Sequence, residues 1–117
     1  MISKLHRLNE REVRKVLSKR KPFFSYTLVA NVIPNTLGYA RCGILLSGKQ
    51  TKGSVNRNSF RRIFYDVSRG YLQKTSSDIV VVVKKGTVFN RKDLKQIEEF
   101  KRDLIFLWNT ITKKKNP

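Results

Sequence analysis

Residues 52–69 of this chain, KGSVNRNSFRRIFYDVSR, separate into two faces when they are read at about 100° per residue. One face is an apolar stripe that predicts packing against a core: Phe60, Ile63, Phe64, Val67 and Tyr71. The other face carries amide and guanidinium groups, offset by a single acid, Asp66: Arg57, Asn58, Arg61, Arg62 and Arg69. The stretch therefore predicts an amphipathic helix over residues 55–72, with Ser54 as its N-cap.

A helix that packs on one face and presents guanidinium groups on the other suits phosphate binding, because the planar guanidinium meets phosphate oxygens in pairs. A merely solvated basic face is the alternative reading of such a helix. The whole chain favours phosphate binding, since 26 Lys and Arg against 8 Asp and Glu give a net charge of +18 over 117 residues. Self-repulsion at this density disfavours a compact state, so we expect a polyanionic partner.

The charge is concentrated in the first half of the chain. Residues 1–65 hold 14 basic and 2 acidic residues, for a net of +12, whereas residues 66–117 hold 12 and 6, for +6. A membrane surface would require a lipid-facing amphipathic helix or a lipidation motif, and the chain has neither a Met-Gly start nor a C-terminal prenylation cysteine. No apolar run approaches transmembrane length. We therefore expect a cytoplasmic protein that does not bind membranes.

The chain has little of the side-chain chemistry that catalysis requires. Cys42 is the only cysteine and His6 the only histidine, so a cysteine metal cluster or a Ser–His–Asp triad would lack supporting groups. Cys42 lies in an apolar run and is expected to be a buried strand residue. A stand-alone nuclease is disfavoured for the same reasons, because Asp and Glu do not cluster at metal-ligand spacing.

The remaining elements follow from periodicity and turn residues. The expected order is a helix at 9–20 capped by Asn9, strands at 23–33 and 39–46, the arginine-bearing helix, a strand at 78–84, and a helix at 91–111 capped by Asn90. A further short strand has room between residues 47 and 53. The chain is thus one α+β domain over residues 1–117, an α-β-β-(β)-α-β-α sandwich with a small sheet and a disordered tail at 113–117. Strands 39–46 and 78–84 form a β-α-β unit if they pair in parallel.

Several segments match a known pattern in the same order: HRLNEREVRKVL at 6–17, RCGILLS at 41–47, a lysine-bearing loop, RNSFRRIFY at 57–65, and DIVVVV at 78–83. Together they resemble the protein component of bacterial ribonuclease P over nearly the whole chain. The motif of that family is Arg-Asn-Arg-x-Lys-Arg-x-x-Arg. Arg57, Asn58, Arg61 and Arg62 keep its order and spacing, whereas Ser59 and Tyr65 stand where the motif has arginine.

The resemblance implies a function and a topology. In that family a catalytic RNA carries the active site and its Mg²⁺, and the protein binds this RNA together with the 5′ leader of precursor tRNA, with no further protein partner required. The resemblance and the polar face of the helix together give the expected RNA-binding residues: Lys49, Lys52, Arg57, Asn58, Arg61, Arg62 and Arg69. The implied leader cleft, between the first helix and the sheet, is lined by Val13, Leu17, Thr27 and Val29. The implied β-α-β crossover is left-handed, as in the second domain of a small-subunit ribosomal protein, against the usual right-handed rule.

Two alternatives remain open at the level of sequence. The same charge and fold would suit a ribosomal protein or another structural RNA-binding module without a nuclease role. Val13 and Leu17 fit ordinary packing between helix and sheet as well as they fit a leader cleft. Phe24 and Tyr26 suit base stacking, although an aromatic residue on a strand is more often part of a core.

Overall fold

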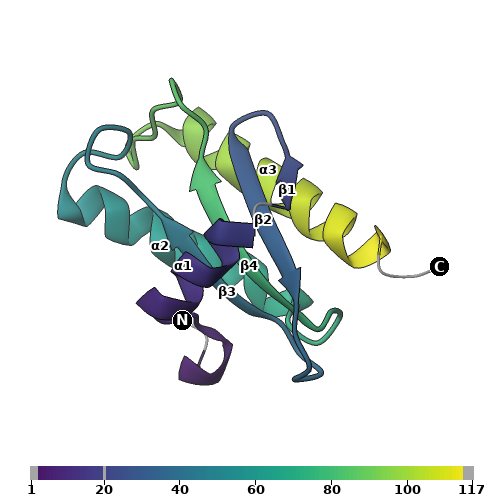
Figure 1. The fold of residues 1–117 in the computed structure, drawn as a ribbon. Coiled ribbons are helices and arrows are strands. Elements are labelled where there is room, and N and C mark those ends of the chain that lie inside the picture. Colours follow the sequence, from purple (N-terminus) through teal and green to yellow (C-terminus); the bar gives the residue numbers. More distant parts are fainter. Residues whose placement is uncertain (1–2, 20, 115–117) are drawn as a thin grey trace.

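The computed structural model describes residues 3–19 and 21–114. Its centre is a four-stranded sheet in the order β1-β2-β4-β3 (Figure 1). The strands are β1 (Pro22–Phe24), β2 (Leu28–Pro34), β3 (Arg41–Leu45) and β4 (Ser77–Val83). α1 (Glu10–Lys19) packs on one face, whereas α2 (Ser54–Ser68) and α3 (Leu94–Lys114) pack on the other. Short 3₁₀ helices, η1 (Lys4–His6) and η2 (Arg69–Tyr71), precede α1 and follow α2.

The predicted α+β class and its β-α-β unit are confirmed. β3 and β4 are neighbours and run parallel, with Cys42 opposite Ile79 and Ile44 opposite Val81. α2 connects these two strands. β4 pairs antiparallel with β2 on its other side, so the apolar run of β4 lies in the interior of the sheet, as its continuous hydrophobicity predicts.

The strand expected over residues 23–33 is wrong in one respect, because it is a hairpin of two strands. β1 and β2 pair antiparallel, and the chain turns at residues 25–27. Ser25 and Leu28 close the turn through their backbone and the Ser25 hydroxyl, and the backbone N–H of Thr27 donates to Asp103 Oδ2 on α3 at 2.8 Å. The strand that the prediction lacked is therefore β1. Residues 48–50, in the segment where a further strand was expected, form a turn.

The N-cap of α1 is the residue that the sequence predicts, whereas the N-caps of α2 and α3 differ from the prediction. Asn9 caps α1 as predicted: its Oδ1 accepts the Glu12 N–H, and Glu12 Oε1 accepts the Asn9 N–H, both at 2.8 Å. α2 begins at Ser54, so its N-cap is Gly53, whose φ of 86° suits glycine. The cap of α3 is Asp93 instead of Asn90, since Asp93 Oδ1 accepts the N–H groups of residues 95 and 96.

α3 also extends through Lys114, three residues beyond the expected end and into the segment expected to be a disordered tail. The rest of that segment, residues 115–117, lies outside the described residues. The longer helix keeps Ile111 in the core at its C-terminal end.

The two faces of the sheet have separate cores. The larger one, under α2 and α3, is built from aromatic side chains and the inner residues of the strands, including Phe60, Phe64, Phe89, Phe100 and Trp108. Trp108 Nε1 donates to Ser68 Oγ at 3.0 Å, which satisfies its buried N–H. The smaller core, under α1, consists of Val16, Ile33 and Val80 with partly buried Leu8, Val13, Leu17 and Val82.

α1 approaches the sheet closely at Gly43. A Cβ at this position would lie 3.5 Å from Val13 Cγ2 and 3.8 Å from Leu8 Cβ. A larger side chain would therefore push α1 away from β3. The space above Gly43 therefore accepts a methyl group at ordinary contact distance but no larger side chain without movement of α1.

Cys42 is a buried strand residue, as expected. Burial raises the pKa of its thiol to about 12, so the thiol stays protonated at neutral pH. Because the thiolate is the reactive form, this cysteine is chemically inert in the folded protein.

Candidate nucleic-acid interface

The structure places the predicted basic residues together on α2 and on the loop that precedes it. Lys49 and Lys52 are exposed on the loop, and Asn58, Arg62 and Arg69 are exposed on the helix. Arg57 and Arg61 lie at the border of the buried face and are half-buried. The loop and the helix that follows it thus carry these cations together, and we call this group of residues the α2 surface.

Local contacts hold two of these guanidinium groups in place. Arg57 Nη1 donates to the Thr51 carbonyl at 3.2 Å, and Gly48 lies against the same guanidinium. The lysine-bearing loop is therefore packed on the first arginine of the helix. Arg61 Nη1 donates to Asn58 Oδ1 at 2.8 Å, so the asparagine of the motif orients the neighbouring arginine.

The α2 surface keeps most of its charge unopposed. Arg69 pairs with Asp66 at 3.5 Å, but both side chains are more than half exposed, and such pairs contribute little. Within the described part of the chain, Lys49, Lys52 and Arg62 have no ion pair. The surface can therefore receive phosphate groups without first breaking internal salt bridges.

Two further basic residues join this surface that the sequence did not indicate. Arg91 and Lys92 line a depression of about 500 Å³ at the N-terminus of α2, opposite Lys52. Asn56 holds them there, because its Nδ2 donates to the Phe89 carbonyl and its Oδ1 accepts the Arg91 N–H. The positive end of the α2 dipole adds to the charge of this depression. Asn56 is part of the helix pattern, but its long-range partners have no local sequence signal.

The two departures from the family motif have different environments. Ser59 Oγ donates to the Val55 carbonyl one turn earlier, so its side chain lies along the helix. Tyr65 is buried beside Arg7 and Arg61. Burial raises the pKa of the Tyr65 phenol, which these two arginines lower in part, so the hydroxyl remains a hydrogen-bond donor.

Three of the four residues expected in a leader cleft lie on α1 or on the face of the sheet beside it. Val13 and Leu17 pack into the smaller core and are half-buried. Val29 is half-buried and lies opposite Val82 on β4 and opposite Phe24 on β1. Phe24 itself is 61% exposed, with Lys84 Nζ 5.6 Å from the centre of its ring. The uncovered end of the sheet therefore offers an apolar and aromatic strip beside α1.

Thr27 does not belong to this strip. It is buried, and both its N–H and its hydroxyl donate to Asp103 Oδ2 on α3, which packs on the opposite face of the sheet. This arrangement fixes the β1–β2 turn to α3. The expectation that Thr27 lines the leader cleft is therefore wrong, because it rested on a strand that continues through residue 27.

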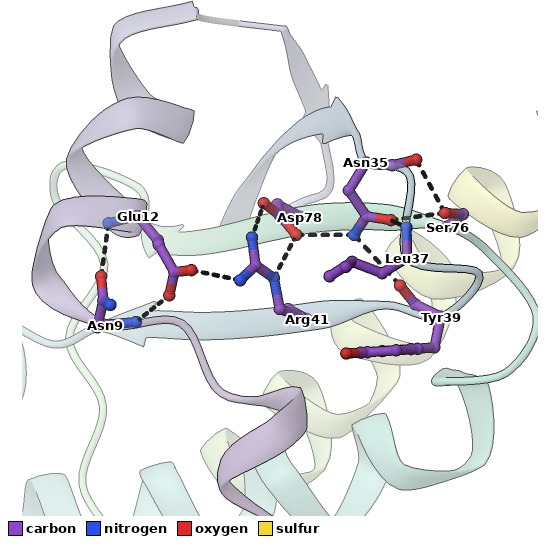
Figure 2. Close-up of polar contacts among 8 residues, drawn as sticks. All are labelled: Asn9, Glu12, Asn35, Leu37, Tyr39, Arg41, Ser76 and Asp78. Atoms are coloured by element: carbon purple, nitrogen blue, oxygen red, sulfur yellow. Dashed lines mark hydrogen bonds and ion pairs between the residues drawn. The ribbon is translucent and has the colours of Figure 1, made fainter.

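Arg41 links α1 to the sheet through two carboxylates (Figure 2). Its Nε and Nη2 donate to the two oxygens of Asp78 at 2.9 and 2.7 Å, and its Nη1 donates to Glu12. Asn35 Nδ2 donates to Asp78 Oδ1 at 2.8 Å. The hydrogen bonds and charge of Asp78 and Glu12 raise the pKa of Arg41 further above its usual range. The network fixes the first turn of α1 over β3 and β4.

Replacing Arg41 by methionine is expected to lower the free energy of unfolding by about 2 kcal/mol, because it leaves the buried Asp78 carboxylate without its cation. Urea denaturation at constant ionic strength measures this change. In an Asp78→Asn background the same replacement should cost clearly less, since no buried charge is stranded. Equal costs in the two backgrounds would show that the ion pair does not hold α1 in place.

Two structural findings bear on other kinds of site. Among residues 3–19 and 21–114, no group of three or more His, Cys, Asp or Glu side chains is arranged to hold a metal ion. In the same residues, no helix is both long and apolar enough to cross a membrane.

The fold and the α2 surface define a small α+β domain with an arginine-rich helix between two parallel strands. The sequence model of the family described as ribonuclease P matches residues 2–111, and the chain belongs to that family. A curated relative, the ribonuclease P protein component of Idiomarina loihiensis, is 32% identical over 83 residues. The match covers 69% of this chain and spans 62% of the length of that relative.

Solved structures of ribonuclease P proteins have the same fold. The Staphylococcus aureus protein superimposes with a TM-score of 0.73 at 17% identity, over 91% of this chain and 94% of that one. The Thermotoga maritima protein, solved in complex with 1-(4-fluorophenyl)-2-thiourea, gives a TM-score of 0.66 at 23% identity, over 84% and 92%. The overall likeness therefore extends over nearly the whole domain.

Proposed function

We propose that this protein is the protein subunit of ribonuclease P, which binds the catalytic RNA and the 5′ leader of precursor tRNA and so supports endonucleolytic 5′ maturation of tRNA. The observation that carries the proposal is the α2 surface. There Arg57, Asn58, Arg61 and Arg62 keep the order of the family motif and lie beside Lys49 and Lys52. A ribosomal or other structural RNA-binding role is the alternative, and no observation favours it.

In this proposal the protein contributes binding and orientation. Guanidinium and ammonium groups of the α2 surface neutralise backbone phosphates of the catalytic RNA, with release of counterions. The strip formed by Val29, Phe24 and the exposed parts of Val13 and Leu17 holds the single-stranded leader by stacking and apolar contact. The Mg²⁺ of the reaction would be held by the catalytic RNA, where it would supply an activated water. The protein works in the cytoplasm and requires no further protein partner.

The RNA-free protein is expected not to cleave precursor tRNA, whereas its addition to a cognate catalytic RNA should raise the cleavage rate at low magnesium. The physical reason is that its positive charge replaces counterions that the two RNA molecules otherwise need to approach each other. Gel assays of leader release over a magnesium series measure the effect. Lys95→Gln/Lys101→Gln/Lys113→Gln, which removes three charges from exposed positions on α3, serves as the control.

Metal-dependent, site-specific cleavage by the RNA-free protein would contradict the proposed function. Sequencing the RNA that co-purifies with the protein from its native cell separates the alternatives: ribosomal RNA would favour the structural role, and a catalytic RNA with precursor tRNA would favour the subunit.

A further inference from the structure

A separate cationic depression lies between the N-terminal segment and the far end of α2. It has a volume of about 520 Å³, and its polar lining includes Lys4, Arg7, Glu12, Arg41 and Tyr65. Tyr65 is one helical turn beyond Arg61, so the depression adjoins the α2 surface. Apart from Arg41, the cations of this lining are Lys4 and Arg7. Both lie in the N-terminal segment, whereas the predicted RNA-binding residues begin at Lys49.

The backbone of this depression is held in place by the edge of the sheet. Arg7 forms a parallel bridge with Cys42, and the Leu8 N–H donates to the Cys42 carbonyl at 3.1 Å. The Arg7 N–H donates to the Lys4 carbonyl at 3.2 Å, and His6 Nδ1 is hydrogen-bonded to the Ala40 carbonyl at 3.0 Å. The segment is therefore ordered before any ligand arrives, which lowers the entropic cost of binding.

The acid in the lining forms its ion pair with Arg41, and not with either N-terminal cation. Glu12 is paired with Arg41, which also binds Asp78 (Figure 2). Within the described residues, Lys4 and Arg7 have no ion pair. The depression thus presents two cations that have no ion pair among the described residues, beside a network in which one guanidinium binds two carboxylates.

Arg7 also has a hydrogen-bonding capacity that the described residues leave unused. Its Nε is shielded from solvent and has no acceptor among them. A buried donor without an acceptor is unfavourable, and for a charged group more so. The hydroxyl of Tyr65, beside Arg7, is a further donor at the same place. Donors and positive charge converge here, which is the chemistry that recognises a phosphate.

We propose that this depression binds a phosphate group of the RNA backbone, with Lys4 and Arg7 as its cations and the Tyr65 hydroxyl as a neutral donor. The inference rests on the proposed function, because it assigns a second contact to the RNA already expected at the α2 surface. The bound RNA then runs from the lysine-bearing loop along α2 and reaches the N-terminal segment beyond Tyr65.

The test compares a Lys4→Gln/Arg7→Gln variant with a Lys95→Gln/Lys101→Gln control, in which the same charge is lost from exposed positions on α3. Binding of the catalytic RNA is measured over a salt series. The first variant should bind about fivefold more weakly at 0.15 M salt and lower the log–log salt slope by about 0.7–0.9, the values for one lost phosphate contact. The control should keep the slope of the unaltered protein. Tyr65→Phe, which removes only the hydroxyl, should weaken binding without changing the slope.

An NMR titration of the Arg7 Nε–Hε signal with inorganic pyrophosphate distinguishes free phosphate from RNA as the ligand. A saturable shift together with weaker RNA binding by Lys4→Gln/Arg7→Gln supports the proposal. A shift without an RNA effect overturns the RNA assignment and leaves a site for free phosphate.

An Arg57→Gln/Arg61→Gln/Arg62→Gln variant, measured in parallel, separates the two proposals. If it binds RNA weakly while Lys4→Gln/Arg7→Gln matches its control, the depression has no role and the proposed function stands. If both variants bind like the unaltered protein, both proposals are overturned.

Discussion

Replacing Arg57, Arg61 and Arg62 together by glutamine is expected to weaken binding of the catalytic RNA by about 100-fold at 0.15 M salt. Each lost phosphate contact should lower the log–log salt slope by about 0.7–0.9, which corresponds to about fivefold in affinity at this salt concentration. Glutamine is chosen because Arg57 also donates to the Thr51 carbonyl, and a side chain with an N–H donor disturbs the loop less than alanine does. Filter binding over a salt series measures both quantities.

The matched control for this variant is Lys95→Gln/Lys101→Gln/Lys113→Gln, which carries the same net charge and alters only exposed positions of α3. It should bind RNA nearly as tightly as the unaltered protein, because both variants lose three charges and only the first also loses contacts with the RNA. Thermal unfolding should separate binding from folding. A triple arginine variant that binds normally but unfolds at a lower temperature would mean that these arginines are structural.

The sequence predicted the elements whose signal is local. The apolar stripe of α2 and the continuous apolar run of β4 each predict which of their residues are buried. Both elements are found where periodicity places them. The hairpin at residues 25–27 was missed, although Ser25 and Leu28 close its turn locally, and the contact that ties the turn to α3 joins Thr27 to Asp103, 76 residues apart. From their aromatic and β-branched residues alone, residues 23–33 are predicted to form one strand.

The same distinction applies to the candidate interface. The basic residues of α2 follow directly from the sequence, because helical spacing places them on one face. Arg91 and Lys92 do not, since Asn56 brings them to the helix from 35 residues away. Arg41 could not be sorted from the other arginines by sequence, and only the contacts with Glu12 and Asp78 give it a structural role.

Polyvalent anions are expected to stabilise the fold strongly, an effect that follows from charge alone. The described chain places its basic side chains within extents of 38 × 27 × 25 Å. The Debye length is about 30 Å at 0.01 M salt and about 10 Å at 0.1 M, so in dilute buffer the charges of the folded protein repel one another almost unscreened. We therefore expect partial unfolding at low salt and a gain of helix on addition of anions.

Screening alone and binding at defined sites give different results when sulfate is compared with chloride at equal ionic strength. The cations of the α2 surface converge only in the folded state, so an anion that bridges them binds the native protein preferentially. Mass action then stabilises the fold by about RT ln(1 + [L]/Kd), which is about 2.7 kcal/mol at a hundredfold excess over Kd. Circular dichroism should show a higher melting temperature in sulfate. The advantage of sulfate should shrink in the Arg57→Gln/Arg61→Gln/Arg62→Gln variant and persist in the α3 control. Equal melting temperatures in the two salts would show that the basic surface responds to ionic strength alone.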